Sequence, residues 1–138
     1  MRSRIYIPRD SGALSVGAEA VADAVLAEAA RRGVDIEIVR NGSRGLYWLE
    51  PLVEVEVAGQ RIAYGPVAVA DVAGLFDAGW LQGSAHALCH GPSEDIPFLK
   101  NQARLICARI GRTDPLSLDD FRAHGGLAVG QRPALRPL

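Results

Sequence analysis

Residues 18–39 read AEAVADAVLAEAARRGVDIEIV, a stretch that predicts a helix followed directly by a strand. Small apolar residues at positions 18, 21, 22, 25, 26 and 29 share one helical face, while Glu19 and Asp23 point away from it. Gly33 is placed to end this helix, and Ser15 is placed to cap its start. From residue 34 to 39 apolar and acidic residues alternate with the period of a strand.

The segments on either side extend this unit into a sheet. Upstream, residues 5–7 form a short apolar run that Pro8 ends, as expected for a buried strand. A strand, a helix and a second strand in this order predict a parallel pair with a right-handed crossover. Downstream, residues 52–57 and 61–64 flank a tight turn and predict a hairpin.

The hairpin and the next segment complete the first unit. Its valines at positions 53, 55 and 57 share one face, and we expect Glu54 and Glu56 to face outward. Residues 67–78 have helical spacing and end before Gly79. The order is therefore β-α-β-β-β-α, an α/β sandwich that we assign to residues 1–82.

The remainder of the chain, residues 83–138, predicts a linker and a helical extension. Residues 83–95 carry few strand or helix cues. Apolar residues at positions 99, 103, 106 and 110 predict a helix that starts near Pro97 and ends at Gly111. Ser117 then caps a shorter helix that ends at Gly125.

Composition excludes several classes of protein. The 138 residues contain 15 basic and 16 acidic side chains, and this balance argues against nucleic-acid or membrane-surface binding. Two cysteines are too few for a disulfide-stapled secreted fold. No apolar run is long enough for a signal peptide or a membrane span. We therefore expect a soluble, cytoplasmic domain.

The candidate chemical motifs are weak, so we predict no catalytic, cofactor-binding or metal-binding residue in this chain. A set of His86, Cys89, His90 and Cys107 has the right ligands for zinc but poor spacing. The turn from Gly12 to Gly17 lacks the Gly-Lys-Ser/Thr of a phosphate-binding loop. No Cys-x-x-Cys is present for thiol–disulfide exchange.

The loop from Arg40 to Pro51 is the one unusual stretch. It concentrates residue types that carry binding energy at protein interfaces, namely Arg40, Arg44, Tyr47 and Trp48. We expect these four residues to form a partner interface. The alternative is that the two aromatic residues only cover the end of the sheet.

The order of elements and two sequence frames resemble the thioredoxin-like [2Fe–2S] ferredoxins found beside complex I flavoproteins. That family binds its cluster through Cys-x4-Cys, with Gly four residues later, and through Cys-x-Gly-x-Cys, with Pro four residues later. Here Gly17, Gly45 and Pro51 stand in register. The four degenerate ligand positions are Pro8, Ala13, Ser43 and Tyr47. The resemblance implies a thioredoxin-like fold and argues against an iron–sulfur cluster.

The second half is similar to the lead-in of flavoprotein subunits of complex I-like enzymes. That lead-in has the form Gln-x-Arg, Asp-Pro-x-Ser, an aromatic residue and Gly-Gly, matched here from Gln102 to Gly126. A cluster-free thioredoxin-like domain joined to it resembles the β (diaphorase) subunit of NAD-dependent formate dehydrogenases. The stretches 43–55 and 64–67 also look like that subunit.

This resemblance implies an accessory or assembly domain whose partners are the other subunits of a dehydrogenase. It implies FMN, NAD and a [4Fe–4S] cluster for a longer subunit that continues after Leu138, and no cofactor within this chain. Two alternatives stay open: the same domain of a related NAD-linked hydrogenase diaphorase, and a free-standing thioredoxin-like binding module.

Overall fold

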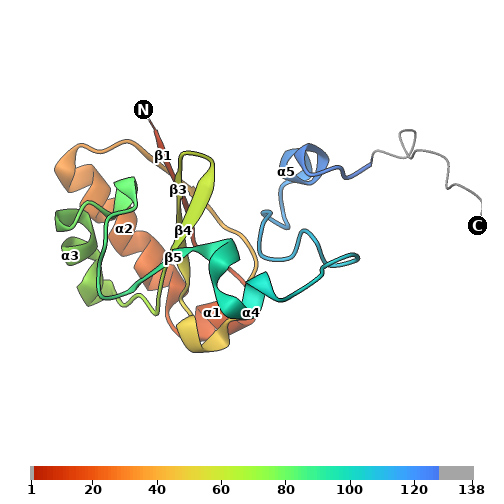
Figure 1. Ribbon diagram of the computed structural model, residues 1–138. Coiled ribbons are helices and arrows are strands. Elements are labelled where there is room, and N and C mark those ends of the chain that lie inside the picture. The colour runs from red at the N-terminus through yellow and green to blue at the C-terminus, as the bar shows by residue number, and fades with distance from the viewer. Residues whose placement is uncertain (1, 128–138) are drawn as a thin grey trace, which may run out of the picture.

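A five-stranded mixed sheet forms the centre of the computed structural model, which describes residues 2–127 (Figure 1). Its order is β2-β1-β3-β4-β5, with β1 and β2 parallel and the other neighbours antiparallel. The strands are β1 Ser3–Tyr6, β2 Ile36–Val39, β3 Val53–Val57, β4 Gln60–Tyr64 and β5 Cys89–Pro92. The predicted parallel pair and the predicted hairpin are both confirmed.

The long helix α2 (Ala18–Arg32) connects β1 to β2, and Gly33 ends it at φ 66° as predicted. A separate short helix, α1 (Ser11–Ser15), precedes it. The prediction that Ser15 caps α2 is therefore wrong: its hydroxyl donates to the Gly12 carbonyl inside α1. Gly17, at φ 97°, begins α2 instead, a conformation that costs glycine little.

The main core lies between the sheet and the layer formed by α2 and α3 (Val72–Asp77), which cover the same face in Figure 1. Tyr64 and Trp80 are fully buried there with their rings at 80° and 5.7 Å between centroids. The odd-numbered residues of β3 also join this core, as their alternation predicted. Among residues 2–127, no helix has the length and apolar character needed to cross a membrane.

Strand β5 was not predicted, because the sequence Cys-His-Gly-Pro from 89 to 92 has no alternation of apolar and polar residues. It pairs with β4 at the edge of the sheet, where a glycine and a proline are tolerated. The sheet therefore continues beyond residue 82, where we had expected the linker to begin.

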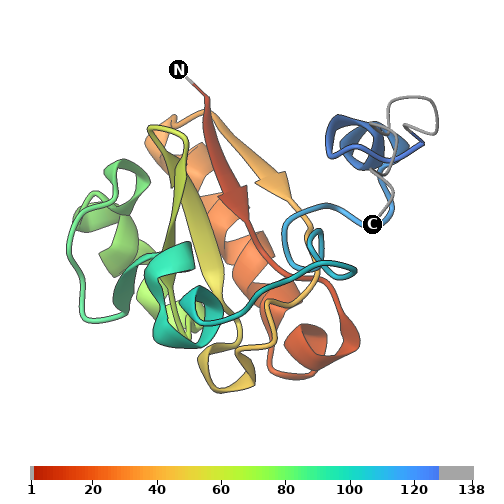
Figure 2. The same cartoon turned by 45° about the vertical axis from the view of Figure 1, so that its right-hand side comes forward.

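The helix predicted over residues 97–111 is wrong. Only α4 (Pro97–Lys100) forms, and irregular turns follow to α5 (Leu118–Ala123), the shorter helix that the sequence predicted with Ser117 as its cap. Ile106 is 97% exposed, so the apolar stripe has no surface to pack against as a helix. This segment crosses to the side of the sheet opposite α2 and α3, and α5 stands away from the sheet (Figure 2). The final residues of the predicted extension, 128–138, lie outside the described part.

Candidate interaction surface

A group of four polar side chains lies on the face of the sheet that α2 and α3 leave open, three of them buried and Arg61 partly exposed. We call it the polar cluster, and its members are Asn41, Arg44, Glu54 and Arg61. The carboxylate of Glu54, 1% exposed, lies 2.9 Å from Arg44 Nη2 and 3.5 Å from Arg61 Nη1. The prediction that Glu54 faces solvent is wrong, because the loop after β2 and the segment near residue 111 cover it. Glu56, two residues on, is partly exposed.

Neighbouring opposite charges counter the effect of burial on the pKa values of Arg44 and Glu94. Burial alone would lower the pKa of Arg44, but the charges and hydrogen bonds of Glu54 and Glu94 raise it. Burial likewise opposes ionisation of Glu94, yet Arg44 and Arg112 lower its pKa. Both shifts favour the charged forms of Arg44 and Glu94.

The polar cluster holds the irregular segment against the sheet. The Gly111 carbonyl accepts from Asn41 Nδ2 at 2.8 Å, and the Arg112 carbonyl accepts from Arg61 Nη2 at 2.7 Å. Gly111 has φ 75°, and a Cβ atom there would lie 2.6 Å from Arg44 Cδ. A side chain at position 111 would therefore push the segment off the sheet.

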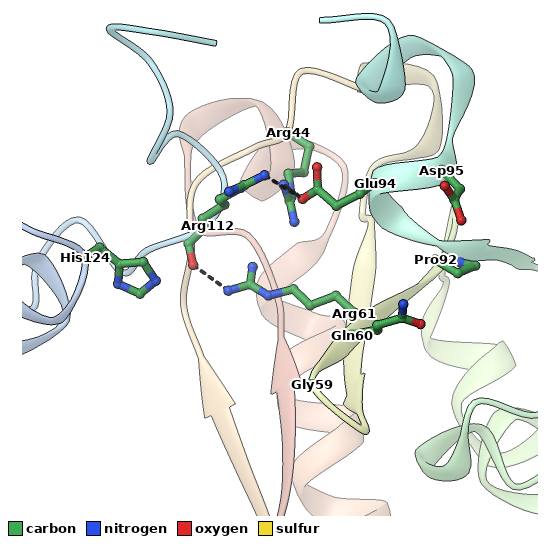
Figure 3. A pocket seen from close by; sticks show the side chains of 9 residues that line it. All are labelled: Arg44, Gly59, Gln60, Arg61, Pro92, Glu94, Asp95, Arg112 and His124. Atoms are coloured by element: carbon green, nitrogen blue, oxygen red, sulfur yellow. Dashed lines mark hydrogen bonds and ion pairs between the residues drawn. The ribbon is translucent and has the colours of Figure 1, made fainter. Parts of the chain in front are cut away.

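A cleft of about 350 Å³ opens above this contact (Figure 3). Glu94 points between Arg44 and Arg112 and lies 3.0 Å from each guanidinium, while Arg61 reaches the Arg112 carbonyl from below. The ring of His124, from the end of α5, stands at the far wall. Because each of these three guanidinium groups already pairs with a carboxylate of the chain, the cleft serves to join segments of the chain.

The two loops that carry the degenerate ligand positions do come together. A Cβ atom on Gly12 would lie 3.6 Å from the ring of Tyr47, which places the start of α1 against the 43–47 loop. Pro8 and Ala13 are buried and offer no donor atom. Tyr47 turns outward, 69% exposed. The Ser43 hydroxyl donates to Glu50 Oε1 at 2.8 Å and accepts from the Gly45 amide at 2.9 Å.

These residues do not fit a [2Fe–2S] cluster, which needs thiolate or imidazole ligands. Both cysteines lie outside the two loops, Cys89 in β5 and Cys107 in the exposed turns after α4. His90 Nε2 lies 2.7 Å from the Gly65 carbonyl, and His86 Nδ1 accepts from the Leu88 amide. No group of three or more metal-binding side chains gathers anywhere in residues 2–127.

A buried carboxyl group lies behind these loops. Glu50 is enclosed by the protein, accepts hydrogen bonds from Ser43 and from the Leu52 amide, and has no cation among its hydrogen-bond partners. Burial raises its pKa above the ordinary value of 4.5, and the two hydrogen bonds offset only part of that effect. Glu50 links the two ends of the 43–50 loop from inside.

Of the residues expected at an interface, the aromatic pair is exposed and the arginine pair is engaged internally. Trp48 is 62% exposed, and its ring meets Phe98 edge-on at 5.3 Å. Arg40 donates to the Ile7 and Pro8 carbonyls and pairs with Glu19, whereas Arg44 belongs to the polar cluster. Burial leaves Arg44 no surface to offer to a partner.

An apolar groove of about 540 Å³ lies beside Tyr47, between the 43–47 loop and the 98–107 segment with Ile110. Phe98, Leu105 and Ile106 contribute to it, and our sequence analysis did not single them out as surface residues. The periodicity had placed Ile106 on the inner face of a helix that does not form. The absence of any acidic residue between 96 and 113 was the available signal that this segment differs from an ordinary solvent-facing loop.

Comparison with known proteins identifies the fold. No family model and no curated protein matches the sequence. A thioredoxin-like [2Fe–2S] ferredoxin from Aquifex aeolicus matches in structure with a TM-score of 0.54 and 16% identity, over 66% of this chain and 92% of that one. A wild-type structure of such a ferredoxin from the same organism gives 0.53 and 17%, over 64% and 96%. The chain therefore has a thioredoxin-like α/β fold.

We expect Glu54→Gln to lower the free energy of unfolding by about 3–5 kcal/mol, because it leaves the Arg44 guanidinium buried opposite a neutral amide. Urea denaturation at pH 7 measures this loss. Glu37→Gln is the matched control, since Glu37 pairs with Arg4 at 3.4 Å in an exposed position and should cost less than about 1 kcal/mol. Equal losses in the two variants would contradict a buried ionic cluster.

The raised pKa of Glu50 predicts a pH-dependent difference between the wild type and Glu50→Gln. The folded protein binds this proton more tightly than the unfolded chain does. The resulting stabilisation is complete below pH 4.5 and is lost as the pH rises through the folded-state pKa. Denaturation curves between pH 4 and pH 7 should show the wild type losing stability relative to Glu50→Gln. A difference that stays constant with pH would contradict the buried, uncompensated carboxylate.

Proposed function

We propose that this chain is a cluster-free accessory domain of the NADH-binding flavoprotein subunit of a NAD-dependent formate dehydrogenase. In that enzyme electrons from formate pass to NAD through cofactors that other parts of the complex hold. The domain itself performs no redox step. It packs against neighbouring parts of the complex and positions the flavoprotein core.

One observation carries the proposal. The fold is that of thioredoxin-like [2Fe–2S] ferredoxins, and the two segments that the sequence frames match to that family's ligand positions lie against each other without a thiolate or imidazole at any of those positions. In the same place the chain exposes Tyr47 and Trp48, and exposed aromatic residues favour protein contact. A ferredoxin fold that has lost its metal ligands and gained an aromatic surface is suited to assembly rather than to carrying electrons.

The lead-in motif supports the flavoprotein context, because its residues form defined local contacts. Arg104 bonds Gln102 and the Arg44 carbonyl, which attaches the motif to the loop after β2. The Ser117 hydroxyl caps α5. Asp120 accepts from the Asp114 amide, so the Asp-Pro-x-Ser stretch forms a compact turn. The segment after α4 is thus hydrogen-bonded to the loop after β2 and packs with it on the sheet.

We expect an antibody against this domain to precipitate formate-dependent NAD reduction from extracts of the source cells. The measurement is the appearance of NADH at 340 nm on the washed beads after formate is added. An antibody depleted with the purified domain is the control. On an immunoblot the antigen should run several-fold above 14.7 kDa.

Two other results would replace the proposal. Hydrogen-dependent but not formate-dependent NAD reduction on the beads would assign the domain to a hydrogenase diaphorase. A band at 14.7 kDa with neither activity would indicate a free-standing binding module.

We also expect the purified chain to contain no stoichiometric iron after anaerobic reconstitution with ferrous iron and sulfide. Pro8, Ala13 and Tyr47 supply no thiolate, and the Ser43 hydroxyl is already hydrogen-bonded on both sides. Iron and acid-labile sulfide analysis, with a thioredoxin-like [2Fe–2S] ferredoxin reconstituted in parallel, measures the content. Iron and sulfide in the ratio of the ferredoxin control would contradict the loss of the cluster.

A further inference from the structure

The apolar groove beside Tyr47 is a hydrophobic surface feature that residues 2–127 leave uncovered. The 98–110 segment forms one wall, where Leu105 is 91% and Ile106 97% exposed. Tyr47 and the loop after β2 form its other side. Adjacent large side chains exposed to this degree on a concave surface are typical of an interaction site.

The groove also carries uncompensated positive charge. Residues 96–113 contain four cationic side chains and no carboxylate: Lys100, Arg104, Arg109 and Arg112. Arg112 pairs with Glu94, and Lys100 lies 4.0 Å from Asp95. Arg104 and Arg109 have no carboxylate partner within residues 2–127. Arg104 lines the groove itself, and Arg109 lies over the ring of Phe121 at 4.7 Å.

The wall of the groove is held at both ends, although it has no regular secondary structure. Arg104 donates to the side chain of Gln102 and to the carbonyls of Ile110 and Arg44, which closes the segment into a loop. At the other end the polar cluster fixes the Gly111 carbonyl. The exposed apolar side chains are therefore presented from an anchored loop, which lowers the entropy cost of binding.

We propose that this groove binds an acidic and apolar segment of a protein partner, with apolar side chains against Ile106 and Tyr47 and a carboxylate near Arg104. The partner's chemistry follows from charge complementarity, since the groove combines an apolar lining with a guanidinium that has no carboxylate partner among residues 2–127. The inference deepens the proposed function and rests on it, because it specifies which surface the domain presents and which chemistry it recognises.

A peptide titration tests the proposal on the full chain. The probes are fluorescein-labelled LEELLEELLEEL and the same peptide with glutamine in place of every glutamate, followed by fluorescence anisotropy at low and at physiological salt. We expect the glutamate peptide to bind at least about tenfold more tightly, with an advantage that falls as salt is added.

Two single substitutions locate the binding surface. Ile106→Asp should weaken binding of the glutamate peptide by at least about tenfold, since it places a carboxylate on the apolar wall. Leu26→Asp is the matched control, because Leu26 is a half-exposed residue of α2 on the opposite side of the sheet, and it should leave the affinity unchanged. Thermal unfolding of both variants verifies that they fold.

Several outcomes would overturn the inference. Equal affinity for the two peptides, no binding of either, or binding that Ile106→Asp leaves intact would each do so. Tighter binding to phosphatidylserine-containing vesicles, lost in Ile106→Asp, would assign the groove to a lipid surface. A dimer in sedimentation that Ile106→Asp dissociates would assign it to a second copy. Each result is independent of whether formate-dependent activity precipitates with the domain, so the two proposals fail separately.

Discussion

The buried pairing of Glu54 with Arg44 organises the whole face of the sheet opposite α2 and α3. A carboxylate in the middle of β3 is costly to bury without partners, and here two guanidinium groups reach it from β4 and from the loop after β2. The Arg61 guanidinium also donates to the carbonyls of Gly111 and Arg112. One buried carboxylate therefore fixes the loop after β2, the β3–β4 pair and the segment that follows α4. The sheet has an apolar core on the face that α2 and α3 cover and a polar cluster on the opposite face.

The sequence predicted the apolar layer well and the polar layer poorly, for a physical reason. Packing between β3 and α2 produces a periodic sequence pattern, since every second residue of β3 and every third or fourth residue of α2 must be apolar. The face of the sheet opposite α2 and α3 produces no such periodic pattern. Glu54 looks like any solvent-facing strand residue until its partners, distant in sequence, are known. Strand β5 was not predicted for a similar reason: its pairing with β4 depends on backbone hydrogen bonds and not on a side-chain pattern.

The candidate site shows the same division. Tyr47 and Trp48 could be predicted as exposed because two large aromatic residues between glycine-rich turns have no strand or helix to bury them. The role of Arg44 could not be predicted, since the sequence around a loop arginine is the same whether its side chain faces solvent or a buried glutamate. Residues 97–111 show the opposite error, because the sequence predicted a helix that the structure does not form beyond α4. Their helical spacing is genuine, but a helix of that length needs a surface to pack against, and here the Arg104 and Gly111 contacts fix the chain in another path.

The 43–50 loop is held by hydrogen bonds among its own residues. Where the ferredoxin pattern has thiolates that a cluster would join, this chain has a serine, and its hydroxyl bridges the Gly45 amide and the Glu50 carboxyl group. Glu50 in turn holds the Leu52 amide, so a chain of hydrogen bonds runs through the loop's interior. Because these hydrogen bonds hold the backbone from inside, the loop keeps its shape while its aromatic side chain at position 47 turns to solvent. Tyr47 adjoins the apolar groove, so the internal hydrogen bonds of the loop also fix one side of that groove.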